Sequence, residues 1–427
     1  MKYRSSLLAL TLLATAAPSF AQLQRGEAPT PEQIQAGEAP AAPEPETEKA
    51  ARELKEQMAA LHWTRTAAQD LLTYVQGVAV EGLEPKDYAP DQLTTALAGA
   101  DDALLSTAAT DTFLRISSDL ALGHVRGDDR LAWHTPDTDI DAQQQYDMMQ
   151  RVIGGAATVR DTLNSLLPTH PQYAELRLLL AKTTDPALRN KVRANMDRWR
   201  WLPRDLGRRY VIVNVPAYTV ALVQDGQVIA RHPVVVGKPS TPTPQINATA
   251  TGVIFNPWWE VPDSISHEVQ GKKGYVSVKN GDKIHYRMPP GPKNALGQVK
   301  LVMPNSLAIY LHDTPSKSLF SRPVRAFSHG CIRTQNIVHF AELLIDDPAW
   351  DRPAIDKVIA SGKTTRVNAT VRTPVYIAYF TVAARANEGG VISYVDIYGR
   401  DKPVLAALSD KPAPPAPTAT TLADSSH

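Results

Sequence analysis

Cysteine is the residue type that this sequence most nearly lacks. A single cysteine, Cys331, occurs among the 427 residues, so no disulfide can form within one chain. The charge is almost balanced, with 45 lysines and arginines against 44 aspartates and glutamates, which argues against a protein that binds nucleic acid through a basic surface. Long apolar runs are also missing. The run from Leu7 to Ala17 is too short to span a bilayer, and no other segment is apolar enough for a membrane helix.

The two ends of the chain have compositions that differ from the rest. Residues 1–21 combine a basic start at Lys2 and Arg4 with an apolar run and small residues before Gln22, which is the pattern of a cleaved secretory signal. An uncleaved anchor is the alternative. Residues 22–48 are rich in Pro, Ala, Glu and Gln, and residues 405–427 in Pro, Ala, Ser and Thr. Because such segments bury too little apolar surface to offset the entropy of ordering, we expect a flexible linker and a disordered tail.

Residues 49–200 have the periodicity of helices. One apolar stripe recurs at helical spacing over Leu105, Ala109, Phe113, Ile116 and Leu120. Two further helices are predicted over 144–167 and 173–182, separated by two prolines. No residue pattern in this region indicates chemistry. Its histidines are isolated in the sequence and are interpreted as structural: His62, His124, His134 and His170.

Residues 201–404 read mostly as strands, so the fold class is α+β, with a helical scaffold domain followed by a mostly β domain. Asp225-Gly226 is a strong hairpin signal between two alternating runs. The segments 252–256 and 258–261 are expected to continue the same sheet, and Lys272 to Lys293 reads as a loop insertion. A helix over 353–361 and strands over 365–372, 375–383 and 391–397 complete the prediction.

The most informative stretch surrounds the lone cysteine. Ser306 to His312 alternates like a strand that ends at His312, and a helix is predicted to begin near Asn336. Cys331 therefore lies in the loop before that helix. A neighbouring imidazole can take the proton of a thiol, and Gly330 lets the backbone present N–H groups to a developing oxyanion. On this reading we expect the thiol pKa to be lowered.

Two other interpretations of this cysteine compete with a nucleophile. A lone cysteine is often a small buried hydrophobe, but an unpaired thiol between Gly, His and Arg in an exported chain is hard to explain as packing. A zinc site is possible by residue type, but the spacing fits no common zinc pattern: His312, His329, Cys331 and His339. A papain-like protease is disfavoured because its cysteine precedes its histidine in the chain. We favour the nucleophile.

The run Ser328-His-Gly-Cys-Ile-Arg333, preceded by Tyr310-Leu-His-Asp-Thr-Pro315, resembles the signature of the L,D-transpeptidase (YkuD) catalytic domain. Four further blocks, in the same order along the chain, resemble the large Gram-negative branch of YcbB type: Arg198-Trp-Arg-Trp-Leu-Pro203, Phe255-Asn-Pro-Trp-Trp-Glu-Val-Pro262, Pro290-Gly-Pro-Lys-Asn-Ala-Leu-Gly297 and Asp396-Ile-Tyr-Gly-Arg-Asp401. The resemblance covers about residues 50 to 401. It departs from the branch in one respect, since residues 181–195 leave no room for the peptidoglycan-binding module common there.

The resemblance implies a periplasmic enzyme that cross-links peptidoglycan stem peptides without a metal or organic cofactor. His312 would be the general base and acid, and Cys331 would attack the donor tetrapeptide, release D-alanine and pass the acyl group from a thioester to an acceptor stem. The oxyanion site would be shaped by His329, Gly330 and Ser328, and the substrate would be met by Arg333, Tyr310, Asn336 and Trp258. Residues 265–295 would form a lid, and carbapenem β-lactams would acylate the cysteine.

Several alternatives remain open at this stage. Arg333 is equally suited to a structural ion pair, Ser328 and Asn336 to holding the loop, and Trp258 to packing. Water as the acceptor would make the enzyme an L,D-carboxypeptidase, and a lipoprotein amine would make it an attachment enzyme. The cross-link could be of 3→3 or 1→3 type. A non-catalytic wall-binding protein of the same fold is the alternative from another class.

Overall fold

The chain was described with a computed structural model, which covers residues 46–281, 283–384 and 390–410. The predicted signal, nearly all of the linker and residues 411–427 of the predicted tail lie outside these residues. Residues from Glu46 onward belong to one unit. No helix in the described ranges has the length and apolarity needed to cross a membrane.

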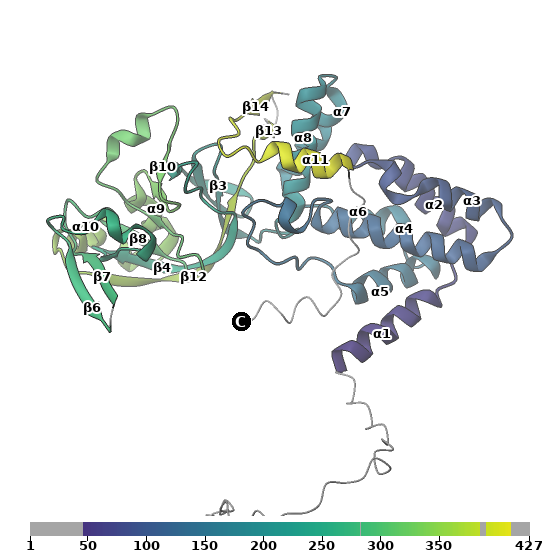
Figure 1. Cartoon of the computed structure of the whole chain (residues 1–427), viewed down its shortest axis with the longest axis horizontal. Coiled ribbons are helices and arrows are strands. Elements are labelled where there is room, and N and C mark those ends of the chain that lie inside the picture. The colour runs from purple at the N-terminus through teal and green to yellow at the C-terminus, as the bar shows by residue number, and fades with distance from the viewer. Residues whose placement is uncertain (1–45, 282, 385–389, 411–427) are drawn as a thin grey trace, which may run out of the picture. The chain divides into compact units, whose positions relative to one another are not determined.

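Helices form the N-terminal part, as predicted (Figure 1). Its core is one apolar cluster that includes every member of the predicted stripe, all with no exposed surface. The long helix predicted over 144–167 is instead two helices, because Gly154 ends the first and Gly155 follows with a positive φ of 72°. The helices are α1 (Glu46–Ala59), α2 (Arg65–Gln76), α3 (Pro90–Ala98), α4 (Asp102–Leu122), α5 (Ala142–Ile153), α6 (Val159–Asn164), α7 (Pro171–Lys182) and α8 (Pro186–Trp201).

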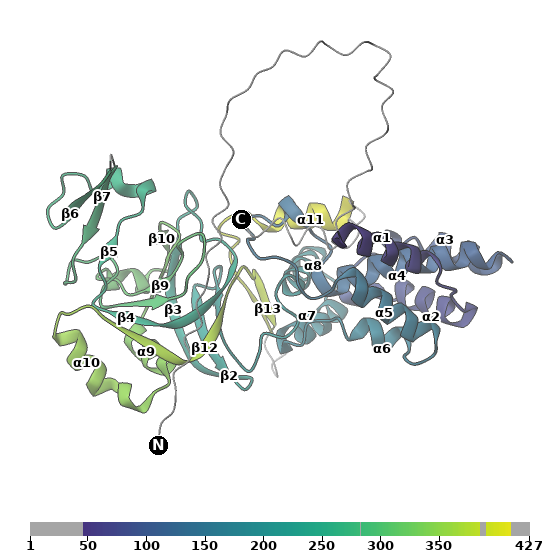
Figure 2. The same ribbon diagram turned by 90° about the horizontal axis from the view of Figure 1, so that it is seen from below.

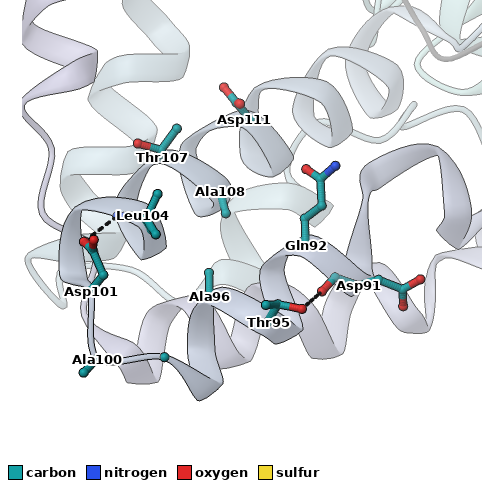
Figure 3. A pocket seen from close by; sticks show the side chains of 11 residues that line it. Asp91, Gln92, Thr95, Ala96, Ala100, Asp101, Leu104, Thr107, Ala108 and Asp111 are labelled. Atoms are coloured by element: carbon teal, nitrogen blue, oxygen red, sulfur yellow. Dashed lines mark hydrogen bonds between the residues drawn. The ribbon is translucent and has the colours of Figure 1, made fainter.

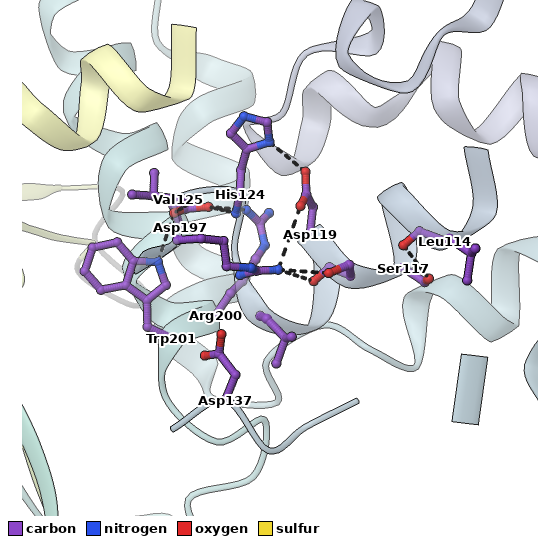
Figure 4. Close-up of polar contacts among 12 residues, drawn as sticks. Leu114, Ser117, Asp119, His124, Val125, Asp137, Asp197, Arg200 and Trp201 are labelled. Carbon is purple, nitrogen blue, oxygen red and sulfur yellow. Dashed lines mark hydrogen bonds and ion pairs between the residues drawn. The ribbon is translucent and has the colours of Figure 1, made fainter. Parts of the chain in front are cut away.

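A buried polar network joins the end of α4 to α8 (Figure 4). His124 Nδ1 donates to Asp119 at 2.6 Å, and Asp119 also accepts from Tyr88 at 2.9 Å. Asp197 of α8 accepts from the His124 backbone N–H at 2.6 Å and from the Trp201 indole at 2.9 Å. The structural interpretation of His124 is confirmed, although this histidine is not isolated in the fold.

The main sheet of the second part has nine strands and closes on itself. Their order is β10-β3-β11-β9-β8-β4-β12-β1-β2, and β2 pairs again with β3. The predicted hairpin is confirmed, since Asp225 and Gly226 both take positive φ, as a two-residue turn between right-twisted strands requires. The strands are β1 (Arg209–Asn214), β2 (Thr219–Gln224), β3 (Gln227–Gly237), β4 (Ile246–Phe255), β8 (Val299–Val302), β9 (Leu311–His312), β10 (Ala326–Ser328), β11 (Ile332–Thr334) and β12 (Thr365–Ala378).

Two helices follow the central stretch. α9 (Ile337–Ile345) begins one residue after Asn336, as predicted, and buries Ile337, Phe340 and Leu344 in the sheet's apolar core. α10 (Arg352–Ala360) matches the helix predicted over 353–361. The strand predicted over 306–312 is wrong for its first five residues. Ala308 has a φ of 52°, which turns the chain, and only Leu311 and His312 pair as β9.

The segment after β4 does not continue the main sheet, which corrects the prediction for 258–261. β5 (Trp259–Glu260), β6 (Val276–Asn280) and β7 (Lys283–Met288) form a separate three-stranded sheet in the order β5-β7-β6 (Figure 2). The predicted loop insertion is therefore largely a β-hairpin, preceded by a 3₁₀ helix over Asp263–Glu268.

The C-terminal part also differs from its prediction. The two strands predicted over 365–383 are mainly the single strand β12, and β13 (Val382–Ala384) pairs with β14 (Val391–Ser393). The predicted disordered tail begins too early, because α11 spans Asp401–Asp410. Val404, Ala407 and Leu408 of this helix are buried against Ala194 and Trp201 of α8. Arg198 of α8 also pairs with Asp401 at 2.6 Å.

Candidate active site

Cys331 is the last of the three residues, 329–331, that separate β10 from β11. Its side chain is half-buried, and its sulfur lies 3.7 Å from the backbone oxygen of Ala308. Gly330 has a φ of 112°, and a Cβ at this position would lie 3.3 Å from the side chain of Ile309. Glycine is therefore needed to bring the chain past Ile309 to the cysteine. The strand β11 stands between Cys331 and α9, so the thiol is not at the helix terminus.

Ser328 holds the loop that carries the cysteine. Its hydroxyl donates to the Cys331 carbonyl oxygen at 2.5 Å and accepts the Gly330 N–H at 3.2 Å. The Gly330 N–H therefore has an acceptor within the loop, and the prediction that the backbone at Gly330 shapes an oxyanion site stays a prediction. The Cys331 N–H has no acceptor among the described residues and is the remaining backbone donor of the pair.

His312 is buried at the end of β9, which runs parallel to β11. Its Nδ1 lies 2.5 Å from the backbone oxygen of Asp313. A carbonyl can only accept, so Nδ1 carries the proton and Nε2 keeps a free lone pair. Burial, followed by the positive charges of Arg333 and Lys300, lowers the pKa of His312 to about 3. The imidazole is therefore a neutral base at any ordinary pH.

Tyr310 and Lys300 also contact the surroundings of the thiol. Burial, followed by the charge of Cys331, raises the pKa of Tyr310, and the Nζ of Lys300 lies 3.8 Å from the centre of the Tyr310 ring. Burial raises the pKa of the Cys331 thiol, although the Tyr310 hydrogen bonds and the charges of Lys300 and Arg333 oppose this shift. The expectation of a lowered thiol pKa is thus wrong. Lys300 was not predicted, since nothing in its sequence context sets it apart from other lysines.

Arg333 has no acidic partner among the described residues. It lies in register with His312, and its half-buried guanidinium feels the charge of a Cys331 thiolate. The interpretation as a structural ion pair is therefore disfavoured, because a partly desolvated guanidinium without a carboxylate is suited to receiving one from a ligand.

His329 contacts two charged side chains outside the loop that carries Cys331, and its role in shaping an oxyanion site stays a prediction. Its Nε2 lies 3.3 Å from Nζ of Lys238 and 3.3 Å from a carboxylate oxygen of Glu268, and one third of its side chain is exposed. Glu268 belongs to the 3₁₀ helix of the insertion, so His329 connects the nucleophile loop to that insertion. Trp258, at the base of the same insertion, packs under the guanidinium of Arg287 at 3.9 Å.

The remaining predicted residues are dispersed. Asn336 is exposed and occupies the position before α9 with a φ of 48°. His339 lies 3.2 Å from His232, which separates it from the residues that a zinc site would need. Across residues 46–281, 283–384 and 390–410, no group of three or more His, Cys, Asp or Glu side chains could hold a metal ion.

A groove lies in the helical part, between α3 and α4 (Figure 3). This groove has a volume of about 620 Å³ and is lined by Ala96, Leu104 and Ala108, with Asp91 and Asp111 at its rim. It contains neither a nucleophilic thiol nor a histidine base. Among the sites described, the residue types for acyl transfer therefore occur together only around Cys331.

Comparisons with known proteins agree with this location. The model of the L,D-transpeptidase catalytic domain (YkuD) matches residues 208–377, and the Scaffold domain model matches residues 55–180. The chain thus contains a region that matches the Scaffold domain, followed by a region that matches the YkuD catalytic domain. A Haemophilus influenzae protein named "Putative L,D-transpeptidase" is 28% identical over 292 residues, which cover 62% of this chain and 57% of that protein. The chain thus spans little more than half the length of this relative.

Solved structures of the same name are more distant. An L,D-transpeptidase from Mycobacterium smegmatis is 19% identical and matches 40% of this chain and 58% of its own, with a TM-score of 0.24. The LD transpeptidase LdtMt1, solved in complex with imipenem, is 18% identical and matches 40% of this chain and 59% of its own, with a TM-score of 0.23.

Proposed function

We propose that this chain cross-links peptidoglycan stem peptides through a thioester on Cys331. The observation that carries the proposal is the pairing of β9 with β11. Arg333 is in register with His312 in this pairing and lies two residues after Cys331, and among the described residues it has no acidic partner, which supports His312 as the base and Arg333 as a binding group for the substrate.

The first half-reaction acylates the cysteine. The thiol proton passes to Nε2 of His312 as sulfur attacks the carbonyl that joins the L-centre of diaminopimelate to the terminal D-alanine. The carbon–nitrogen bond then breaks, the imidazolium returns the proton to the leaving amine, and D-alanine departs. In the second half-reaction an acceptor amine attacks the thioester, and its proton passes through His312 to the departing sulfur.

Because the thiol pKa is raised and the imidazole pKa is lowered, the resting pair is uncharged. Proton transfer therefore accompanies attack rather than preceding it. A substrate carboxylate bound to Arg333 neutralises a charge that opposes the imidazolium, so substrate binding itself makes His312 a stronger base. The Tyr310 hydroxyl and the Cys331 N–H are proposed as the donors to charge that develops at the attacked carbonyl.

The insertion is proposed to cover this site. Its 3₁₀ helix reaches the nucleophile loop through the contact between Glu268 and His329, and closure would exclude water that competes with the acceptor amine. The acceptor and the linkage depend on the shape that this cover gives the site. Transfer to a stem peptide of 3→3 or 1→3 type is our proposal. If the insertion shaped the site differently, the same cysteine could pass the acyl group to water or to a lipoprotein amine.

The test is mass spectrometry of the products formed from a disaccharide-tetrapeptide by the wild type and by Cys331→Ala. Loss of D-alanine together with a cross-linked dimer, both missing in the variant, supports transpeptidation, and fragmentation of the dimer identifies the linkage. D-alanine loss without dimer supports hydrolysis. A wild type that neither reacts nor forms an adduct with imipenem contradicts the enzyme proposal and leaves the wall-binding alternative.

We also propose that the chain is exported to the periplasm, on the basis of the composition of residues 1–21. The test is fractionation of a Gram-negative host followed by N-terminal sequencing. A periplasmic product that begins at Gln22 supports the proposal, and a cytoplasmic product that retains residues 1–21 contradicts it.

A further inference from the structure

The peptide bond between Gly330 and Cys331 is held from its carbonyl side. The Thr243 hydroxyl donates to the Gly330 oxygen at 2.7 Å and accepts the Gly237 N–H at 2.9 Å. A hydroxyl has one proton, and the Gly237 contact uses an oxygen lone pair, so the proton of Thr243 is directed to Gly330. The peptide is trans, and its carbonyl and N–H groups therefore point in opposite directions.

The N–H of this peptide belongs to Cys331, the proposed nucleophile. It has no acceptor among the described residues, whereas the preceding N–H, that of Gly330, is bonded to Ser328. We propose that Thr243 is a positioning residue that aims the Cys331 N–H at the oxyanion formed during acylation. This inference rests on the proposed acyl transfer at Cys331 and adds a residue from outside the signature run.

The hydroxyl, the N–H and the carbonyl of Thr243 are all hydrogen-bonded. Thr243 has no exposed surface. Its N–H donates to the Tyr398 hydroxyl at 3.2 Å, and its carbonyl accepts from the Arg400 guanidinium at 3.2 Å. A Cβ on Gly237 would lie 2.7 Å from the Thr243 nitrogen, so only glycine permits this close approach. Because the threonine cannot shift or rotate without losing these bonds, it can hold the Gly330–Cys331 peptide in one orientation.

The residues that fix Thr243 come from the block Asp396 to Asp401. The Tyr398 hydroxyl also donates to the Gly237 oxygen at 2.6 Å, which joins both sides of the loop after β3. Asp396 accepts the Arg400 N–H at 2.9 Å and the Tyr379 hydroxyl at 2.6 Å, so the turn that carries Tyr398 is closed on itself. This arrangement gives a physical role to a sequence block that contains no residue suited to the chemistry itself.

The experiment compares two reactions of the same thiol. Acylation by imipenem passes through an oxyanion, whereas alkylation by iodoacetamide displaces iodide and forms none. Thr243→Val keeps the side-chain shape but removes the hydroxyl, and Thr243→Ser keeps the hydroxyl. Thr373→Val serves as the control, since Thr373 is an equally buried threonine on β12. Both second-order rate constants are measured by intact-protein mass spectrometry for each full-length variant.

We expect Thr243→Val to slow imipenem acylation roughly 10- to 100-fold, which is less than the loss of a whole oxyanion donor because only its aim is affected. Alkylation should stay within about twofold, and Thr243→Ser and Thr373→Val should acylate within about threefold of the wild type. Tyr398→Phe should show the same selective loss at a smaller size. With the tetrapeptide donor, kcat should fall in Thr243→Val while KM stays unchanged.

Two results overturn the inference. Acylation at the wild-type rate in Thr243→Val shows that the hydroxyl does not act on the oxyanion donor. An equal loss of acylation and alkylation shows that Thr243 only keeps the cysteine in place. A wild type that imipenem does not acylate, although iodoacetamide alkylates it, contradicts the proposed function and is thereby distinguished from both.

Discussion

His312 and Arg333 lie directly opposite one another across the parallel pair β9–β11. The relationship has two consequences for the site. The positive charge of Arg333 is, after burial, the largest cause of the low pKa of His312. The same guanidinium lacks a carboxylate partner among the described residues. Under the proposed function, Arg333 therefore keeps His312 neutral before substrate binds and offers a binding point for the charge of the substrate.

Arg333→Gln should weaken substrate binding more than chemistry. A charge-assisted hydrogen bond to a carboxylate contributes roughly 1.5–3 kcal/mol, which predicts a KM for the tetrapeptide about 10- to 100-fold higher. Arg333→Lys should recover only part of this loss because it cannot bind in two-point fashion. Steady-state kinetics provide the measurement, with Arg366→Gln on the exposed part of β12 as a control. An unchanged KM in Arg333→Gln would show that the guanidinium does not meet the substrate.

The thiol should titrate above its ordinary pKa of 9.0 in the substrate-free protein, since burial disfavours the thiolate. The rate of alkylation of Cys331 by iodoacetamide should therefore keep rising about tenfold per pH unit up to pH 9. Lys300→Met should shift the profile further toward high pH, because it removes a cation that stabilises the thiolate. A plateau below pH 8 in the wild type would instead indicate a preformed ion pair between cysteine and histidine.

Gly297→Ala should destabilise the protein through the residue next to the base. Gly297 has a φ of 59°, and a Cβ there would lie 2.6 Å from Cβ of Asp313, whose backbone oxygen fixes the tautomer of His312. The left-handed backbone conformation alone costs an alanine about 1–2 kcal/mol, and the clash with Asp313 adds to this cost. We therefore expect the free energy of unfolding, measured with urea, to fall by more than about 2 kcal/mol and the activity to be reduced.

Gly362→Ala is the matched control for this change. Gly362 has a similar φ of 65° but no atom within 4 Å of the added Cβ. The free energy of unfolding of Gly362→Ala should fall only by the cost of the left-handed backbone conformation, about 1 kcal/mol, and the variant should keep full activity. Equal losses in the two variants would contradict the predicted clash with Asp313.

His170 should make the protein less stable in acid. Its ring stacks on Trp199 at 4.3 Å, its Nδ1 accepts the Gln172 N–H at the start of α7, and burial lowers its pKa from 6.5 to about 4. Between these two values the unfolded chain binds a proton that the folded chain does not. The contribution of His170 to stability is therefore complete above pH 6.5 and is lost progressively as the pH falls toward 4.

The measurement is urea unfolding at pH 7 and pH 5 for the wild type and His170→Asn, which keeps a helix-capping side chain but does not titrate. Between pH 7 and pH 5, the free energy of unfolding of the wild type should fall by about 1 to 2 kcal/mol more than that of the variant. An equal loss in both proteins would show that His170 is not responsible.

Local signals made much of the fold predictable from the sequence. The stripe around Phe113, the turn at Asp225-Gly226 and the helix start after Asn336 each depend on neighbouring residues, and all three are confirmed. The strand over 306–310 is wrong because Ala308 takes a left-handed conformation that its residue type does not announce. The helix α11 was missed because its apolar side is buried by α8, which lies two hundred residues earlier in the chain.

The candidate site was predictable in its residue types but not in its contacts. Cys331, His312 and Arg333 could be selected because their chemistry is rare and their positions cluster in the chain. The partners of His329, the use of the Gly330 N–H by Ser328 and the approach of Lys300 to Tyr310 depend on the three-dimensional packing of distant strands. No periodicity or spacing in the sequence carries this information.

The central claim is that Cys331 forms a thioester with the donor peptide. The most direct measurement is intact-protein mass spectrometry after rapid acid quenching of the wild type mixed with a disaccharide-tetrapeptide and no acceptor, followed by peptide mapping. We predict a mass increase equal to the donor less D-alanine, located on Cys331 and absent in Cys331→Ala. An unmodified Cys331 in a sample that nevertheless releases D-alanine would contradict the claim.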